Sequence, residues 1–401
     1  MPDLPWSFTV IDDAAVNAFA LPGGPIFITR GILTHMNSEA ELASVLGHEI
    51  GHVTARHSAQ QLSRQQFTQL GLGVGSALSP EIAGLAQAGS AGLQLLFLKY
   101  GRDAERQADE LGFRYMLKEG WDPNEMPKMF ATLQRVSAAA GGDRLPGYLA
   151  THPDPGDREA VAKKRAAEVN QPGLVVHREE YLAKVNGMPF GEDPRQGFFQ
   201  GDTFVHPALK FRIDLPAGWK KQNGAAAVVA VSPGEDALVQ LRDTGKATPA
   251  EASKEFLAQQ GVQAANGPSS LDGLPPGSSY FQAQTDQGAL AGLASFVPHG
   301  GETFGILGLT QASKLGAQDA TFRKTVSSFA ELKDPALLAV QAPKLQIVKV
   351  PRDMTVAEFV QQNPALVPVD EVATINGLAK DGRLAAGQQA KRLVGGVPPP
   401  K

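Results

Sequence analysis

Hydrophobic positions at the start of the chain follow a strand-like pattern. Residues 7–11 and 25–29 are rich in β-branched and aromatic residues, and Pro22-Gly23-Gly24 between them is typical of a tight turn. These runs predict two strands. The segment from Asn17 to Gly24 either offers a free strand edge to a peptide or is purely structural.

From about residue 38, the apolar residues follow the spacing of a helix. Apolar residues from Leu42 to Val53 recur at intervals that place them on one face of a helix. Ser38, followed three positions later by Glu41, is a capping-box signal, so we expect the helix to begin there. Further helices are predicted over residues 93–119, 127–139 and 158–169.

The pattern changes near residue 187. Residues 188–204 are rich in Gly and Pro and predict a linker. The following residues predict strands over 211–215, 227–231, 237–241 and 291–297 and one helix over 249–260, which is typical of a small α+β domain. The expected fold class is α+β: a mainly helical domain (residues 1–187), the small α+β domain (205–335), a short βααβ module (344–394) and a loose tail (395–401).

Composition limits the classes of protein that fit. The chain has 401 residues, of which 42% are apolar and 19% charged, so two or three domains with real cores are expected. A net charge of −4 gives no basic surplus, and we therefore expect no nucleic acid partner. Cysteine is absent, which excludes disulfides and thiolate metal ligands. The first ten residues show neither the basic nor the apolar segment of a signal peptide.

A long, weakly charged stretch spans residues 70–98. Glu81 is its only charged residue, and Ser79-Pro80-Glu81 interrupts it near the middle. The length would suit a membrane span, but the interruption and the many Gly, Ala and Gln residues favour a buried or membrane-grazing helical hairpin. We therefore expect this stretch to make peripheral membrane contact at most.

The sequence His48-Glu49-Ile50-Gly51-His52 carries the clearest chemistry. Residues four apart on a helix lie one turn apart on the same face, so His48 and His52 can bind one zinc ion together. Glu49 is placed to take a proton from a metal-activated water and pass it to a leaving amine. The alternative is a helix with two structural histidines, but this pattern is rare by chance.

A catalytic zinc needs a third protein ligand, and without cysteine it must be His, Glu or Asp. Glu105 is our candidate, because Glu105 and Asp109 lie one turn apart on a second predicted helix. Asp109 could then accept the outer N–H of a ligand histidine and set its orientation. The alternative for this acidic pair is a solvated helix face.

Further short motifs accompany these residues. They are Asn17-Ala18-Phe19-Ala20-Leu21-Pro22-Gly23-Gly24, Thr29-Arg30-Gly31, Arg56-His57 after the histidine pair, Glu105-x-x-Ala108-Asp109, and Thr151-His152-Pro153 with Arg158. Through them, residues 10–57 and 99–158 closely resemble the M48 family of zinc metallopeptidases. The resemblance implies a zincin-like fold, one Zn²⁺ per chain on His48, His52 and Glu105, and Glu49 as general base and acid.

The resemblance also implies roles for two more residues. In soluble envelope members of the family, the histidine that corresponds to His152 lies near the metal. There it either assists the transition state or fills the fourth coordination position and holds the enzyme latent, and both roles are carried over to His152. Arg158 is expected to anchor this loop or to support the oxyanion. The other histidines, His57 among them, are expected only to pack or cap, because their spacing matches no ligand set.

The two appended units resemble other modules. Residues 205–331 faintly resemble small α+β modules of the MOG1/PsbP type and show no catalytic set, so partner or substrate binding is expected of them. Residues 344–394 resemble a LysM-like module, of the kind that binds peptidoglycan or chitin, although Arg352-Asp353 stands where a glycine normally precedes the acid. Peptidoglycan is therefore an expected partner of this module.

Together these features predict a zinc-dependent endopeptidase. As the resemblance implies, its expected place is the bacterial periplasm or cell envelope, and its expected substrates are polypeptides of misfolded or misassembled envelope proteins. Two alternatives stay open. One is a latent zincin that acts mainly as a chaperone or assembly factor, and the other is a peptidoglycan-associated binding protein with a vestigial metal site.

Overall fold

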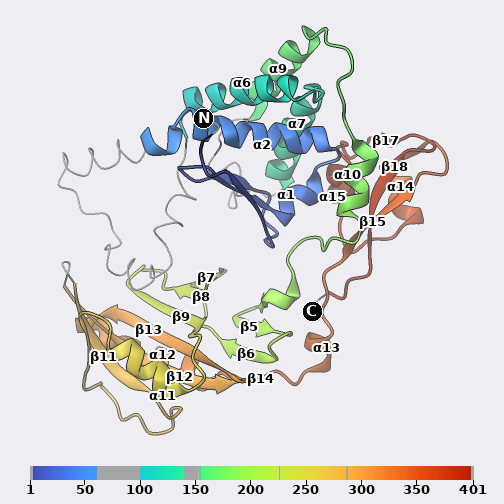
Figure 1. Cartoon of the computed structure of the whole chain (residues 1–401). Helices are drawn as coiled ribbons and strands as arrows, with labels where there is room; N and C mark the ends of the chain where they lie inside the picture. Colours follow the sequence, from blue (N-terminus) through green and yellow to red (C-terminus); the bar gives the residue numbers. More distant parts are fainter. Residues whose placement is uncertain are drawn as a thin grey trace. The chain divides into compact units, whose positions relative to one another are not determined.

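The computed structural model describes residues 3–60, 100–139, 152, 155–224, 226–285 and 288–398. Among the described residues, 194–341 form one compact unit, here the second unit, whereas residues 3–60, 100–139, 152, 155–193 and 342–397 form the first unit. Figure 1 shows the C-terminal elements of the first unit, in red, beside its helices α10 (Arg178–Val185) and α1 (Arg30–His35). Among the described residues, no helix combines the length and hydropathy needed to cross a membrane. The hairpin predicted in residues 70–98 lies outside the described residues.

The first unit begins with a three-stranded sheet. β1 (Ser7–Ile11) pairs in parallel with β3 (Pro25–Thr29), and β2 (Ala18–Ala20) pairs antiparallel with the other edge of β3. Both predicted strands are confirmed, and β2 is an additional strand between them in sequence. Thr29 ends β3, and its hydroxyl caps the following helix, α1 (Arg30–His35).

Helix α2 (Glu39–Thr54) carries the predicted histidine pair. Ser38 caps its start, as predicted, and accepts a hydrogen bond from the Glu41 amide at 3.1 Å. The second half of the expected capping box is replaced, because the Glu41 carboxylate accepts a hydrogen bond from the Asn37 amide at 2.6 Å. The side chain of Glu41 therefore reaches back past the cap residue and is buried.

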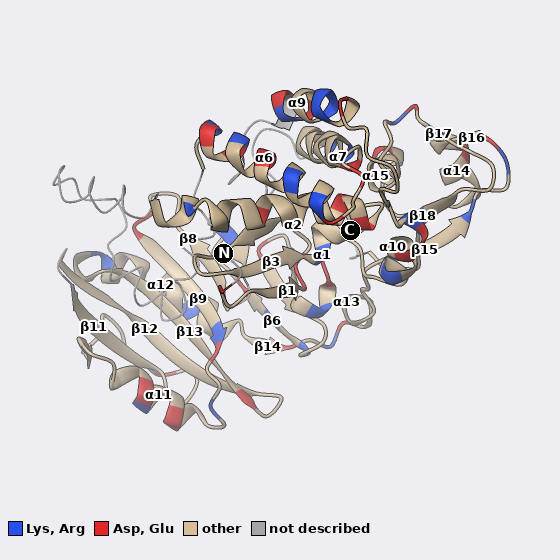
Figure 2. Cartoon of the chain, turned by 45° about the horizontal axis from the view of Figure 1, so that its top comes forward, with Lys and Arg blue, Asp and Glu red and all other residues tan. Residues whose placement is uncertain are grey.

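Further helices build the rest of this part of the first unit. The predicted helix over residues 93–119 is α6 (Arg102–Lys118) within the described residues, and the next one, α7 (Glu125–Ala139), begins two residues earlier than predicted. α9 (Pro155–Ala167) lies slightly before its predicted range, and α10 (Arg178–Val185) is not predicted by the pattern. Figure 2 shows acidic and basic residues mixed along α6 and α9, as is usual for the exposed face of a helix.

Helices α2 and α6 cross at very short range, because small residues line the crossing. A Cβ atom added at Gly112 would lie 2.9 Å from the His48 backbone nitrogen, and one added at Gly47 would lie 3.1 Å from the Gly112 carbonyl oxygen. A larger side chain at either position would push the two helices apart. This close approach allows side chains from α2 and α6 to meet at one point.

The C-terminal residues pack into the same core as the helices of the first unit. Leu345, Ile375 and Leu393 belong to the hydrophobic cluster that also contains residues of α1, α2 and α7. Their elements follow the predicted order of strand, helix, helix, strand, while the likeness to LysM modules stays a prediction. These elements are β15 (Lys344–Lys349), β16 (Met354–Thr355), α14 (Val356–Gln362), α15 (Val369–Ile375), β17 (Arg383–Leu384) and β18 (Gln389–Val394), and β15 pairs antiparallel with β18.

Lys391 on β18 joins these C-terminal elements to the helices. Its ammonium group is fully buried and donates to the carbonyl oxygens of Thr34 at 2.9 Å, Ile375 at 3.0 Å and Met36. These carbonyls lie at the ends of α1 and α15, where the backbone has unpaired acceptors. The buried Glu41 carboxylate interacts favourably with this charge. Burial lowers the pKa of Lys391 to about 7 and raises the pKa of Glu41 to about 7.

Replacing Lys391 by Met is expected to lower the free energy of unfolding of the first unit by about 3–5 kcal/mol, the usual cost of removing one member of a buried charged pair. The three carbonyls lose their donor, and Glu41 loses its counter-charge. Urea unfolding of the full chain measures the change. Lys349→Met, on the exposed side of β15, is the matched control and should cost less than about 0.5 kcal/mol. Equal losses in both variants would contradict this role of Lys391.

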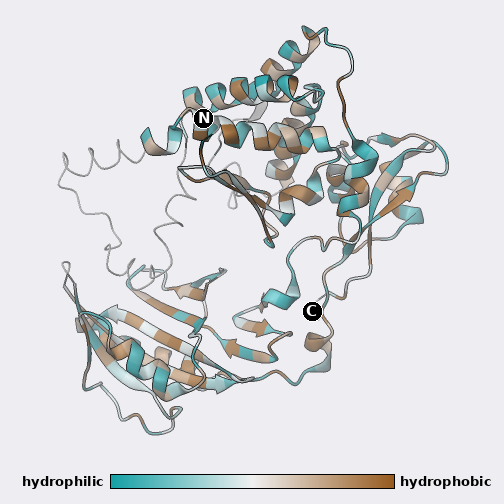
Figure 3. Ribbon diagram, in the orientation of Figure 1, coloured by the Kyte–Doolittle hydropathy of each residue, from teal (hydrophilic) through white to brown (hydrophobic). Residues whose placement is uncertain are grey.

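The second unit is built on an antiparallel sheet of seven strands in the order β10-β11-β12-β13-β9-β8-β7. On β12 (Gly288–His299), Ala291 and Leu293 share a core with α12 (Leu315–Ser327), whereas Leu290 and Phe296 share one with α11 (Pro249–Leu257). A helix therefore covers each face of the sheet. Figure 3 shows that apolar residues, in brown, occur along the strands, as expected for a sheet covered on both faces. The other strands are β7 (Lys220–Asn223), β8 (Val228–Val231), β9 (Ala237–Asp243), β10 (Val262–Ala264), β11 (Ser279–Thr285) and β13 (Glu302–Gln311).

The structure corrects the predicted linker over residues 188–204. Strand β4 (Phe198–Gln200) lies within it and is the edge of a second sheet, of order β14-β6-β5-β4. The Phe198 side chain is buried in a small core with Val205 and Leu332, and this burial outweighs the turn-forming Gly and Pro residues around it. Its partners in the sheet are β5 (Thr203–His206), β6 (Phe211–Asp214) and β14 (Ala330–Glu331).

Candidate metal centre

The predicted ligand residues come together in the interior of the first unit. His48, Glu49 and His52 project from α2, Glu105 projects from α6, and His152 lies between α7 and α9 in sequence. All five are almost completely buried, with at most 2% of the residue exposed. One ligand atom from each of His48, His52, Glu105 and His152 lies within 4.8 Å of the ligand atoms of the other three.

The spacing of these atoms suits a metal ion. The Nε2 atoms of His48 and His52 are 2.9 Å apart, and the Nδ1 atom of His152 lies 3.3 Å from the Nε2 atom of His48. The Glu105 carboxylate lies 3.4 Å from the His52 Nε2 atom and 3.0 Å from the His152 Nδ1 atom. Donors held tetrahedrally at zinc bond lengths would lie about 3.3 Å apart. The four side chains therefore fit such an ion as they stand.

Asp109 and Arg158 surround the ligands. The Asp109 Oδ1 atom accepts a hydrogen bond from the Nδ1 atom of His48 at 2.8 Å, which leaves the Nε2 atom facing the cluster. Arg158 donates to Asp109 through Nε and Nη2, at 2.7 Å each, and its Nη1 atom lies 2.8 Å from Glu105 Oε2. Its guanidinium group also covers the Phe130 ring at 4.7 Å. Arg158 therefore ties together Glu105 and Asp109 of α6.

Glu49 lies beside the cluster of potential ligand residues. Both carboxylate oxygens are buried, and within the described part of the chain neither accepts a hydrogen bond. The nearest charged atom is the His152 Nε2 atom, 3.7 Å from Glu49 Oε1. Burial raises the pKa of the Glu49 carboxyl above its usual value. Because an unpaired buried carboxylate is costly, Glu49 is ready to accept a hydrogen bond or a proton from a bound molecule.

Charges within the cluster shift the pKa values of its other members. Burial alone would raise the pKa of Glu105, but His152 and His52 beside it hold that pKa well below its usual range. Burial and the neighbouring His48 lower the pKa of His52 far below its ordinary value, so its ring is neutral. Burial would lower the pKa of His152, yet the negative charges of Glu105 and Glu49 raise it.

Two residues that sequence reasoning did not select lie against the ligands. His57 was expected only to pack or cap, but its Nδ1 atom is 2.9 Å from the Nδ1 atom of His52. The Tyr100 ring stacks on the His52 ring, with the ring centroids 4.0 Å apart. The sequence feature that could have pointed to His57 is the pair Arg56-His57, which directly follows the helix with the histidine pair. Nothing in the sequence points to Tyr100.

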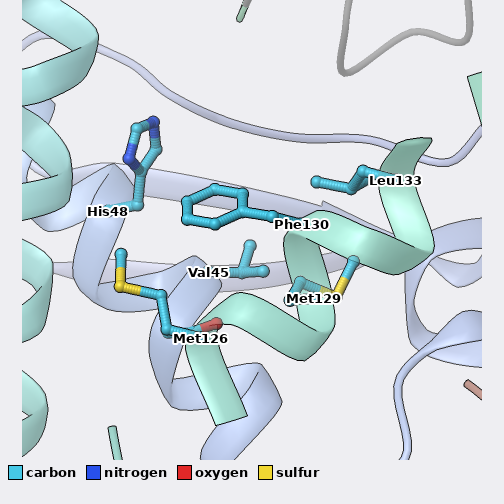
Figure 4. Close-up of a pocket in the computed structure, with 7 residues that line it drawn as sticks. Val45, His48, Met126, Met129, Phe130 and Leu133 are labelled. Carbon is cyan, nitrogen blue, oxygen red and sulfur yellow. The ribbon is translucent and has the colours of Figure 1, made fainter. Parts of the chain in front are cut away.

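A small apolar hollow lies beside His48, between α2 and α7. Figure 4 shows the His48 ring at its edge, above Val45, Met126 and Phe130. Apolar side chains thus back this face of the His48 ring and lower the local dielectric constant. Electrostatic interactions within the cluster are stronger as a result. Ser44, Met129 and Leu133 complete the lining.

Comparison with known proteins identifies relatives of the first part of the chain. Residues 1–166 match the family described as Peptidase family M48. The mitochondrial metalloendopeptidase OMA1 of Arabidopsis thaliana is 34% identical over 175 residues, which are 43% of this chain and 34% of that protein. The beta-barrel assembly-enhancing protease of Escherichia coli (strain K12) is 35% identical over 190 residues, 45% of this chain and 38% of that protein. The chain therefore spans little more than a third of these relatives.

Among solved structures, cyanobacterial PsbP from Synechocystis sp. PCC 6803 is 16% identical to this chain. It covers 32% of this chain and 91% of its own, with a TM-score of 0.23. This likeness is too weak to assign a fold, so the MOG1/PsbP resemblance of residues 205–331 stays a prediction.

The matched residues contain the buried histidine pair, Glu49, Glu105 and His152. The Arabidopsis thaliana relative is named a metalloendopeptidase, and the Escherichia coli relative is named a protease. Sequence match, named relatives and geometry together support a metalloendopeptidase. The first 166 residues of the chain therefore resemble the peptidases of family M48.

Proposed function

We propose that this chain is a zinc-dependent endopeptidase. In this proposal, His48, His52 and Glu105 hold the ion, and Glu49 is the general base and acid. The observation that carries it is the buried Glu49 carboxylate, which accepts no hydrogen bond within the described residues and lies beside a cluster of four metal-ligating side chains. The short distances between the ligand atoms support the same conclusion.

Each residue has a defined task in this reaction. Bound zinc supplies an acidified water and polarises the carbonyl of the scissile bond. The Glu49 carboxylate takes a proton from the attacking water and delivers it to the leaving amine. Asp109 keeps a proton on the Nδ1 atom of His48, so the Nε2 atom stays available as a ligand.

We propose unfolded or misassembled polypeptides of the bacterial envelope as substrates. The name of the Escherichia coli relative, which refers to β-barrel assembly, supports this choice. Strand β2 is an edge strand and could pair with an extended peptide through main-chain hydrogen bonds. Such pairing demands little of the substrate sequence, and this suits the recognition of unfolded chains.

The test compares one substrate in two states. The zinc-loaded full chain is mixed with reduced, carboxymethylated α-lactalbumin, which cannot fold, and in parallel with the native protein. We expect cleavage of the unfolded form, loss of cleavage with a chelator, and recovery with Zn²⁺. If neither the wild type nor its His152→Ala variant cleaves, the endopeptidase proposal fails, and the chaperone or assembly alternative is favoured.

One observation favours a latent form of this enzyme. The Nδ1 atom of His152 lies among the other ligand atoms, 3.0 Å from Glu105 and 3.3 Å from the Nε2 atom of His48. A catalytic zinc site has three protein ligands and one open position. We therefore propose that His152 fills the fourth position and must move away before a substrate is cleaved.

The variant His152→Ala is expected to cleave the unfolded substrate severalfold faster, because the fourth position is then open to water and substrate. Zinc content should stay near one ion per chain, since three ligands remain. Initial rates at saturating zinc measure the effect. His177→Ala, which removes an exposed imidazole, is the matched control and should leave the rate unchanged. A slower His152→Ala enzyme that retains zinc would show instead that His152 assists the transition state.

A further inference from the structure

His57 continues a chain of hydrogen bonds behind the ligand His52. Helix α2 ends at Thr54, and Arg56 adopts a left-handed backbone with φ of 58°, which turns the chain back toward the helix. The His57 side chain is buried, and its Nδ1 atom lies 2.9 Å from the Nδ1 atom of His52. On the other side of the ring, the Nε2 atom lies 3.0 Å from the Oε1 atom of Gln107 on α6.

The amide oxygen of Gln107 sets the direction of both hydrogen bonds. An amide oxygen only accepts, so the Nε2 atom of His57 must donate to it. A neutral His57 then has a lone pair on Nδ1, and the Nδ1 atom of His52 must be the donor between the two rings. The Nε2 atom of His52 is left with its lone pair, and this is the atom that faces the ligand cluster.

The two ligand histidines thus have different partners. The Nδ1 atom of His48 faces a carboxylate, Asp109, whereas the Nδ1 atom of His52 faces the imidazole ring of His57. An acceptor without a negative charge sets the tautomer and adds nothing to the acidic groups Glu49, Glu105 and Asp109 already at the site. The stacked ring of Tyr100 limits rotation of the His52 ring as well.

We propose that His57, held by Gln107, is a positioning residue that keeps His52 in the tautomer and the orientation that bind a metal. It acts through His52 and lies outside the cluster of four ligand atoms. The inference rests on the proposed metal site and adds two residues to it. One of them, Gln107, is exposed to solvent and can be changed without disturbing the core.

The experiment measures Co²⁺ binding to the full chain by competition with a chelator, together with the visible spectrum of the Co²⁺ protein. In His57→Asn, the side-chain oxygen takes the place of the Nδ1 atom and can still accept from His52, whereas in His57→Leu nothing can accept. We expect His57→Leu to weaken Co²⁺ binding by about 10- to 100-fold and to change the spectrum, and His57→Asn to keep most of the affinity. Gln107→Met should weaken binding by less, and Arg106→Met, its exposed neighbour, should have no effect.

The melting temperature of each metal-free variant separates positioning from packing. The inference predicts that His57→Asn and His57→Leu differ in Co²⁺ affinity even where their metal-free melting temperatures agree. Equal affinities in these two variants, in a wild type that binds Co²⁺, would overturn the inference and leave the proposed function standing. A wild-type chain that binds no Co²⁺ would overturn the proposed function and the inference with it.

Discussion

Replacing Glu49 by Gln is expected to lower kcat/KM for an unfolded substrate by about 10²- to 10⁴-fold, the usual contribution of a positioned general base. The amide has nearly the shape of the carboxylate but cannot take a proton from water. Zinc content should not change, because Glu49 is not among the four clustered ligand residues. The fold should also persist, since a neutral amide is easier to bury than a carboxylate.

The measurement combines steady-state cleavage with metal analysis of the same preparations. Glu110→Gln, at an exposed position of α6, is the matched control and should match the wild type in both. A Glu49→Gln protein that cleaves as fast as the wild type would refute the assigned role. If Glu49→Gln cannot cleave but still prevents aggregation of the unfolded substrate, a chaperone role independent of cleavage gains support.

Replacing His48 by Ala is expected to remove the bound zinc and all metal-dependent cleavage with it. The variant loses one ligand atom, and Asp109 and Arg158 lose a partner at the edge of the cluster. Its zinc affinity should therefore fall by more than the roughly 10- to 100-fold that is typical when only an outer partner of a ligand is lost. Metal content after dialysis against a weak chelator measures the effect.

His299→Ala, in the second unit, is the control for zinc bound at other histidines and should leave the metal content unchanged. The melting temperature of the metal-free proteins shows whether His48→Ala still folds. A folded His48→Ala protein that keeps one tightly bound zinc ion would place the metal elsewhere and refute the proposed centre.

Several features of the site could be predicted because they depend only on local geometry. Residues four apart on a helix share a face, so the spacing of His48 and His52 is enough to indicate a ligand pair. The same argument pairs Glu105 with Asp109 on the second helix, and the capping residue Ser38 marks where the metal helix begins. The residues of each pattern lie within one or two helical turns of one another, so the pattern can be recognised in the sequence alone.

Parts of the second unit escaped prediction for a physical reason. β13 is apolar over nearly its whole length, because α11 and α12 cover opposite faces of the sheet. A strand buried on both faces loses the alternation that identifies a half-buried one. β4 was missed because one buried aromatic residue, Phe198, outweighs its Gly-rich surroundings.

The sequence by itself determined which residues we propose to carry the chemistry, since metal-ligand spacing on a helix is a local property. Only the tertiary structure determined how they are supported. The glycine contacts that bring α2 onto α6 and the insertion of Lys391 between the ends of α1 and α15 join segments far apart in the sequence. The turn that places His57 behind His52 depends on one unusual backbone angle at Arg56. No periodic pattern encodes such contacts, because they are set by how whole elements fill space together.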